Sequence, residues 1–223
     1  MRIAALETST ELCSVALWLD GRLLSAREPA GQRHSEWLLP MLDGLLAEAG
    51  IKLKDLDGIA FGSGPGSFTG LRIACGVTQG LAFGAGLPVL GISTLLAMAE
   101  ASALDRVLAC LDARMGEVYL AAHEQTAQGW VTRIEACLVR PEQAPELPGP
   151  GWTGCGSGFS AHGATLAQRY GGQLVGAQPE RFPEASAIAR LAAPLFAAGR
   201  GLPAERALPV YLRDKVALKV RER

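Results

Sequence analysis

The fold of this chain is decided by a glycine-rich run, Gly62-Ser63-Gly64-Pro65-Gly66-Ser67-Phe68-Thr69-Gly70-Leu71-Arg72. An apolar segment, Leu56 to Phe61, precedes the run and is typical of a strand, and a helix is expected to follow it as far as about Gly84. A loop of this kind can bind phosphate, because free amides and the helix dipole attract anions. It can equally let the backbone pass close to a neighbouring segment. The run matches neither a Walker loop nor Gly-x-Gly-x-x-Gly, so both interpretations stay open.

The helix that follows the run carries glycines four residues apart, on one ridge with an arginine. Each interior glycine costs about 1 kcal/mol relative to alanine, and a row of them lets another helix approach closely. The edge beside this ridge is a mixed polar and apolar surface, as at a docking face. The same pattern also fits packing against a second helix of the same domain. The residues concerned are Arg72, Cys75, Gly76, Gln79, Gly80, Phe83 and Gly84.

A second helix is expected from His34 to Ala49, and its apolar side chains cover about half of its circumference. A helix that only covers a sheet needs an apolar arc of about 100°. The surplus apolar surface predicts a further partner, and it is assigned to Trp37, Leu38, Met41 and Leu45. His34 is interpreted as a hydrogen-bonding residue at the helix start, because no second His or Cys stands near it in the sequence.

The order of the remaining segments predicts an α/β protein built in two parts. Three antiparallel strands open the chain, with a polar turn, Glu7-Thr8-Ser9-Thr10, between the first two, and strands and helices alternate after them. We expect a first domain over residues 1–104 and a second over residues 105–223. The second part repeats the strand–turn–strand opening of the first, and Gly151 to Gly158 forms a second glycine-rich loop before a helix.

Composition excludes several classes of protein. The chain has 223 residues, is 49% hydrophobic and 19% charged, and has a net charge of −1, which gives no overall attraction to nucleic acid. Its five cysteines are scattered without a Cys-x-x-Cys pair, as in a cytoplasmic protein with reduced thiols. No signal peptide or membrane span is expected. The basic tail, residues 213–223, fits a solvated end or an RNA contact.

Five segments in order along the chain resemble the TsaB (YeaZ) family of tRNA threonylcarbamoyladenosine biosynthesis. They are Leu6 to Leu17, His34-Ser35-Glu36 with Leu38-Leu39-Pro40, Gly64 to Arg72, Asp112-Ala113-Arg114 with Glu117-Val118-Tyr119, and Pro209 to Arg213.

The resemblance implies an actin-like, ribonuclease H-like fold of two lobes, with mixed sheets flanked by helices. It implies a cytoplasmic, non-catalytic scaffold that binds the catalytic protein TsaD and, with TsaE, supports threonylcarbamoyl transfer to tRNA. It also implies a homodimer when the chain is alone, tRNA contact only through the complex, and no membrane contact. The interface would be formed by the two helices described above.

Two enzymatic alternatives remain beside this scaffold role. In actin-like folds the Glu7 to Thr10 turn would bind a nucleotide phosphate, but such folds usually place Asp where this chain has Glu7. We expect a vestigial turn and no cofactor, with a weak or partner-shared ATP or ADP site as the alternative. The second alternative is a metalloprotease of the glycoprotease type. No metal site is expected, because His34, His123 and His162 lie far apart in the sequence.

Overall fold

The structure is a computed structural model, and it describes residues 1–213. The first lobe is built on a five-stranded sheet in the order β3-β2-β1-β4-β5. The first three strands in sequence are antiparallel neighbours, whereas β4 and β5 add to β1 in parallel. The strands are β1 (Arg2–Glu7), β2 (Leu12–Leu19), β3 (Arg22–Pro29), β4 (Gly58–Gly64) and β5 (Val89–Ser93).

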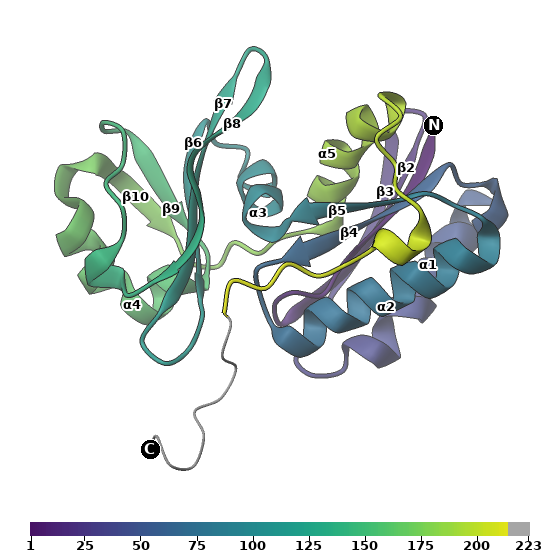
Figure 1. Ribbon diagram of the computed structural model, residues 1–223, viewed down its shortest axis with the longest axis horizontal. Helices are drawn as coiled ribbons and strands as arrows, with labels where there is room; N and C mark the ends of the chain where they lie inside the picture. The colour runs from purple at the N-terminus through teal and green to yellow at the C-terminus, as the bar shows by residue number, and fades with distance from the viewer. Residues whose placement is uncertain (214–223) are drawn as a thin grey trace.

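Helices cover both faces of this sheet (Figure 1). One face packs against α1 (His34–Ala49) and α2 (Phe68–Ala85), in a core that includes Leu38, Leu42 and Phe61. The other face packs against α5 (Ala185–Ala197), whose Ile188 and four of whose alanines (Ala185, Ala187, Ala189 and Ala192) are fully buried. Because both faces are covered, β1 and β4 are apolar along nearly their whole length and are buried.

Local sequence signals set the ends of the helices. The Ser67 hydroxyl accepts a hydrogen bond from the Gly70 amide at 3.3 Å and so caps the start of α2. Gly86 ends α2 in the left-handed conformation, with φ of 66°, which glycine adopts without steric cost. Ser93 caps α3 (Thr94–Ser102) in the same way as Ser67 caps α2. The helices predicted over 34–49 and from the glycine-rich run to about Gly84 therefore form where they were expected.

The second lobe repeats the strand order of the first. Its sheet runs β10-β9-β6-β7-β8, so an antiparallel group of three strands is again extended by two parallel strands. Helix α4 (Ser157–Tyr170) covers one face, and α3 lies against the other, between the two lobes (Figure 1). The strands are β6 (Arg106–Asp112), β7 (Val118–Thr126), β8 (Gly129–Val139), β9 (Trp152–Cys155) and β10 (Leu174–Gln178).

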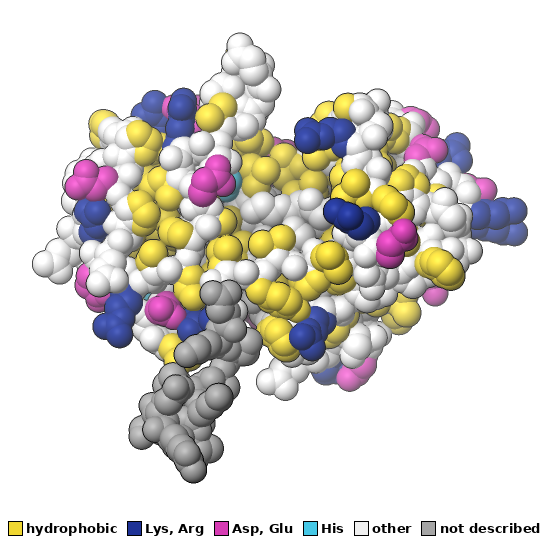
Figure 2. All heavy atoms as spheres, viewed as in Figure 1, with side chains coloured by type: hydrophobic (Ala, Val, Ile, Leu, Met, Phe, Trp, Pro, Cys, Tyr) yellow, Lys and Arg dark blue, Asp and Glu magenta, His cyan; other side chains and the backbone are white. Residues whose placement is uncertain are grey.

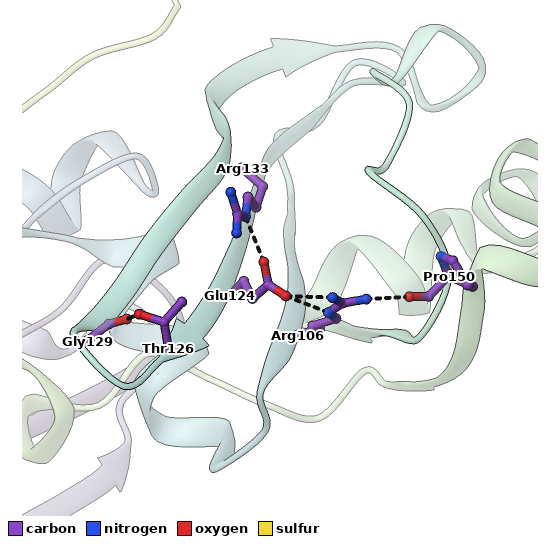
Figure 3. A network of polar contacts seen from close by, with 6 residues as sticks. All are labelled: Arg106, Glu124, Thr126, Gly129, Arg133 and Pro150. Carbon is purple, nitrogen blue, oxygen red and sulfur yellow. Dashed lines mark hydrogen bonds and ion pairs between the residues drawn. The ribbon is translucent and has the colours of Figure 1, made fainter.

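A polar network fixes the outer part of the second sheet (Figure 3). Glu124 on β7 accepts hydrogen bonds from Arg133 on β8 and Arg106 on β6, each at 2.7 Å. Arg106 also donates to the carbonyl of Pro150, which anchors the proline-rich connection between β8 and β9. Hydrogen bonds from the two arginines lower the pKa of Glu124, and the bond from Arg133 has the larger effect. This cluster is fully paired, so it holds the lobe together and offers no free group for chemistry.

The two-lobed α/β fold predicted from the sequence is confirmed. The division of the chain between the lobes differs from the prediction in its last part, from α5 onward. The expectation assigned all of residues 105–223 to the second lobe. Instead, α5 packs on β1 and β2 of the first sheet, and Leu202 pairs with Val89 of β5. The physical reason is the apolar surface of α5, which covers the second face of the first sheet. The basic tail expected over 213–223 lies outside the described residues, apart from Arg213.

Candidate functional site

The glycine-rich run makes direct backbone contact with the polar turn between β1 and β2. A Cβ added at Gly70 would lie 1.9 Å from the Thr8 carbonyl oxygen, and one at Gly66 would lie 2.6 Å from that of Ser9. The Thr8 hydroxyl donates to the Gly70 carbonyl at 2.7 Å, and the Ser67 amide donates to the Ser9 carbonyl at 2.7 Å. Of the two interpretations left open by the sequence, the close-approach role is therefore realised in the structure.

Glu7 ends β1 and begins the polar turn in which a phosphate site was considered from the sequence. Its side chain is fully buried, and its Oε1 accepts a hydrogen bond from the Ser9 amide at 2.5 Å. A Cβ at Gly62 would lie 1.9 Å from Oε2, which has no hydrogen-bond partner among residues 1–213. Burial raises the pKa of this carboxyl, against the opposing effect of hydrogen bonds from Ser9 and Thr8. The turn is thus closed on its own carboxyl group.

The C-terminal segment, residues 207–213, runs along the same glycine loop and crosses to the second lobe. The Val210 amide donates to the Ser63 carbonyl at 2.7 Å, and the Tyr211 ring lies 5.3 Å from that of Phe68. Arg213 then forms an ion pair with Glu117 at 2.7 Å, beyond the lobe boundary. We call residues 207–213 the C-terminal strap, because they connect the first lobe to the second lobe.

A cleft of about 730 Å³ lies between the lobes and is bordered by the strap. Hydrophobic side chains gather over the middle of the face shown in Figure 2, with charged side chains mostly toward its outer edges. The second glycine-rich loop reaches the cleft through Ser157, whose hydroxyl accepts from the Asp112 amide at 3.1 Å. His34 also lines the cleft, and burial lowers its pKa. Its place at the first position of α1 is where the sequence put it.

The ridge of α2 faces away from the protein. Arg72, Gly76, Gly80 and Gly84 are all exposed, and a Cβ added at any of the three glycines would meet nothing within 4 Å. Phe83 beside them is 83% exposed. Within the described residues, no second helix of the chain covers this ridge, so intramolecular helix packing does not explain its glycines.

The structure redistributes the rest of the predicted interface. Cys75 is buried, and its thiol donates to the Ala207 carbonyl, which also accepts from the Gln79 amide. This edge of α2 therefore packs against the chain's own strap. On α1, Leu38 and Leu45 are buried in the core, because they point toward the sheet and not toward the outer edge.

The prediction of a partner-facing surface is therefore wrong for three residues, Leu38, Leu45 and Cys75, because all three are buried. The sequence pattern measured the width of the apolar arc of α1 but not which part of it the sheet covers. Trp37, 37% exposed, and the half-buried Met41 remain accessible on α1.

The described residues contain neither a metal-binding cluster nor a membrane-spanning helix. Within residues 1–213, no group of three or more His, Cys, Asp or Glu side chains could hold a metal ion. No helix in the same range is long and apolar enough to cross a membrane. All five cysteines are free, and four of them are buried.

Sequence reasoning missed the strap as a part of the site. Tyr211 and Arg213 lie in the segment Pro209 to Arg213, which the resemblance had singled out without a role. The sequence of this segment indicated only an extended chain. Nothing in the sequence showed that the Val210 carbonyl would lie against Gly64.

Comparison with known proteins first defines the class. Residues 27–169 match the family model described as TsaD, tRNA N6-adenosine threonylcarbamoyltransferase. With two sheets of the same strand order, the chain is an actin-like protein of the TsaD-related group.

Full-length relatives then identify the particular family. The chain is 40% identical to the tRNA threonylcarbamoyladenosine biosynthesis protein TsaB of Escherichia coli, over 98% of this chain and 97% of that protein. It is 37% identical to the Haemophilus influenzae protein of the same name, over 98% and 96%. The solved structure of YeaZ from Pseudomonas aeruginosa superimposes with a TM-score of 0.87 at 40% identity, over 95% of this chain and 99% of that one. The chain belongs to the TsaB (YeaZ) family of tRNA threonylcarbamoyladenosine biosynthesis proteins.

Proposed function

We propose that the chain is a non-catalytic scaffold that binds TsaD through α2 and activates it, with TsaE, in threonylcarbamoyl transfer to tRNA. The observation that carries this proposal is the outward ridge of α2. Three exposed glycines with empty space above them, next to a phenylalanine that is 83% exposed, form a surface that nothing in residues 1–213 covers. Exposed apolar surface of this kind is typical of protein interaction sites.

The glycine ridge fits a helical partner in particular. A helix whose surface is reduced to backbone lets another helix come closer than side chains would allow. Trp37 and Met41 extend the same side of the lobe on α1, since both helices cover the same sheet face. We infer that TsaD occupies this surface in the complex and that a second copy of the chain occupies it when TsaD is absent. Contact with tRNA is then made only through the complex, in the cytoplasm.

The non-catalytic part of the proposal is supported by the closed turn at Glu7. The Ser9 amide, which could otherwise bind a phosphate oxygen, donates to the Glu7 carboxyl. The carboxyl is buried with a raised pKa, which disfavours its charged form and so disfavours a role as metal ligand. No cofactor is therefore proposed for this chain alone. In an ATP or ADP site shared across the TsaD interface, TsaD would supply the groups that bind the phosphates.

Co-purification with TsaD tests the docking surface. Gly76→Leu and Gly80→Arg place bulk on the ridge, where an added Cβ meets nothing of residues 1–213 within 4 Å, so both variants should fold. We expect each to lose TsaD while keeping the melting temperature of the unsubstituted chain. Retention of TsaD by both variants would show that the surface is assigned wrongly. A threonylcarbamoyladenosine assay with and without the chain tests the activating role.

The cleft favours one second candidate, a nucleotide-dependent enzyme. Its volume of about 730 Å³ lies in the range of small-molecule sites, and Ser9 and Thr10 line it. The closed turn argues against this function. Calorimetry of the isolated chain with millimolar ATP and Mg²⁺ separates the two, because the scaffold role predicts no heat of binding. No observation favours the metalloprotease alternative, whose ligands are not brought together among residues 1–213.

A further inference from the structure

Arg72 is the one charged residue of α2, and it stands at the beginning of the exposed ridge. It lies four residues before Gly76, so its side chain borders the groove formed by the three ridge glycines. The residue is exposed. A partner that lies along this groove would therefore meet a single positive charge at one end of it.

Two aromatic residues hold the guanidinium group in place. Its central carbon lies 3.9 Å from the centroid of the Phe68 ring, and its Nε donates a hydrogen bond to the Tyr211 hydroxyl at 3.1 Å. The two rings contact each other, with centroids 5.3 Å apart. An arginine held by stacking and by a hydrogen bond at Nε has already lost much of its rotamer freedom, so binding costs less entropy.

The outer edge of the guanidinium has no anionic partner among the described residues. Arg106, Arg133 and Arg213 each form an ion pair with a carboxylate, whereas Arg72 forms none with any acidic side chain of residues 1–213. Its two terminal nitrogens carry the paired donors that match the two oxygens of a carboxylate. The side chain is oriented and stacked, yet its two terminal nitrogens form no ion pair with an acidic side chain of residues 1–213.

We propose that Arg72 is a pre-organised receptor for a carboxylate side chain of the protein that docks on α2. The inference rests on the proposed function and deepens it, because it adds a requirement on the chemistry of the partner. The partner surface should carry an Asp or Glu where the end of its docked helix meets Phe68. Tyr211 acts as a positioning residue, since it contacts Arg72 and brings the C-terminal strap into the same site.

A protein carboxylate fits this surface better than a nucleic-acid phosphate does. Helix α1, which covers the same face of the sheet, exposes Glu36, Asp43 and Glu48 and contains no Lys or Arg. A polyanion would need several positive charges and would be repelled by this acidic helix. One carboxylate paired with one arginine fork does not need such a patch.

Calorimetric titration of the full chain with TsaD of the same organism tests the proposal. We expect Arg72→Ala to weaken binding tenfold or more, and Arg72→Lys to weaken it several-fold, because lysine keeps the charge but lacks the fork. Tyr211→Phe keeps the stacked ring but loses the hydroxyl, so a smaller loss is expected. Arg140→Ala removes an exposed arginine of the second lobe and should leave affinity unchanged. Added salt should reduce the difference in affinity for TsaD between the unsubstituted chain and Arg72→Ala, because salt screens the ion pair.

Three results would overturn the inference. The first is equal affinity of Arg72→Ala and the unsubstituted chain, with equal melting temperatures. The second is full affinity in Arg72→Lys, which would show a role for charge without the fork. The third is a loss of tRNA retention by the complex in Arg72→Ala while its affinity for TsaD is unchanged. Failure of the proposed function gives a different result, in which Gly80→Arg binds TsaD as tightly as the unsubstituted chain.

Discussion

Two sets of glycines lie within 25 residues of each other, and the structure uses them in opposite ways. In the glycine-rich run, which begins in β4 and ends in the first turn of α2, a Cβ at Gly62, Gly66 or Gly70 would lie between 1.9 and 2.6 Å from an oxygen of Glu7, Ser9 or Thr8. On the helix itself, a Cβ at Gly76, Gly80 or Gly84 would meet nothing within 4 Å. The first set is required by the chain's own packing, and the second set is not.

This difference separates glycines that contacts within the chain explain from glycines that such contacts do not explain. A glycine in a helix interior costs about 1 kcal/mol relative to alanine. The loop glycines offset that kind of cost through contacts that only glycine permits. The ridge glycines have no such contact within the described chain, although they destabilise α2. No contact of the described residues explains them, and the docked helix proposed above would supply a benefit outside the chain.

The largest effect on stability is expected in the glycine-rich run, at Gly70 in the first turn of α2. Gly70→Ala would force the Thr8 carbonyl away from α2, and overpacking of this kind costs about 3 kcal/mol. The melting temperature should fall by roughly 6–12 °C for a chain of this size. Thermal unfolding followed by circular dichroism measures the shift. A melting temperature equal to that of the unsubstituted chain would mean that the loop and the turn are not packed as described.

A smaller effect is expected at Glu7, the residue that Gly62 accommodates. Burial raises the pKa of Glu7, so the folded chain holds a proton there that the unfolded chain releases above about pH 4.5. Stability of the unsubstituted chain therefore falls as pH rises from that value toward the raised pKa. Glu7→Gln cannot ionise, so its stability should not fall over this pH range, and the variant should gain on the unsubstituted chain as the pH rises. Urea unfolding at several pH values checks this, and parallel pH profiles of the two proteins would refute it.

The smallest effect on stability is expected on the ridge, where an alanine should stabilise the chain, whereas Gly70→Ala should destabilise it. Gly76→Ala adds a methyl group in open space on a regular helix, so it should raise stability by about 0.5–1 kcal/mol. Chemical denaturation resolves a change of this size when it is compared with Gly70→Ala in the same buffer. If Gly76→Ala lowered stability, some part of the chain would have to contact the ridge, and the comparison between the two sets would fail.

Much of the fold could be predicted from local sequence signals. Strand–turn–strand patterns and the apolar spacing of helices are properties of a few neighbouring residues, and they placed α1 and α2 correctly. The exposed ridge could also be predicted, because a four-residue spacing fixes which residues share a side of a helix.

Long-range contacts explain what local signals could not predict. The burial of Leu38 and Leu45 depends on how α1 is rotated against the sheet, and that rotation is not encoded in α1 alone. The return of α5 to the first sheet joins residues far apart in the chain. Likewise, the link between Arg72 and Tyr211 spans 139 positions, so no spacing rule could have found it. Strand β10, which carries no strong alternation, was missed as well.

The central claim, that the α2 ridge is the TsaD docking surface, is tested most directly by a paired calorimetric titration. TsaD is titrated into Gly80→Arg and into the unsubstituted chain, and both melting temperatures are recorded with the same samples. The account predicts an unchanged fold and at least a hundredfold loss of affinity in Gly80→Arg, because the added side chain fills the space that a docked helix needs. Equal affinity of the two folded proteins would contradict it.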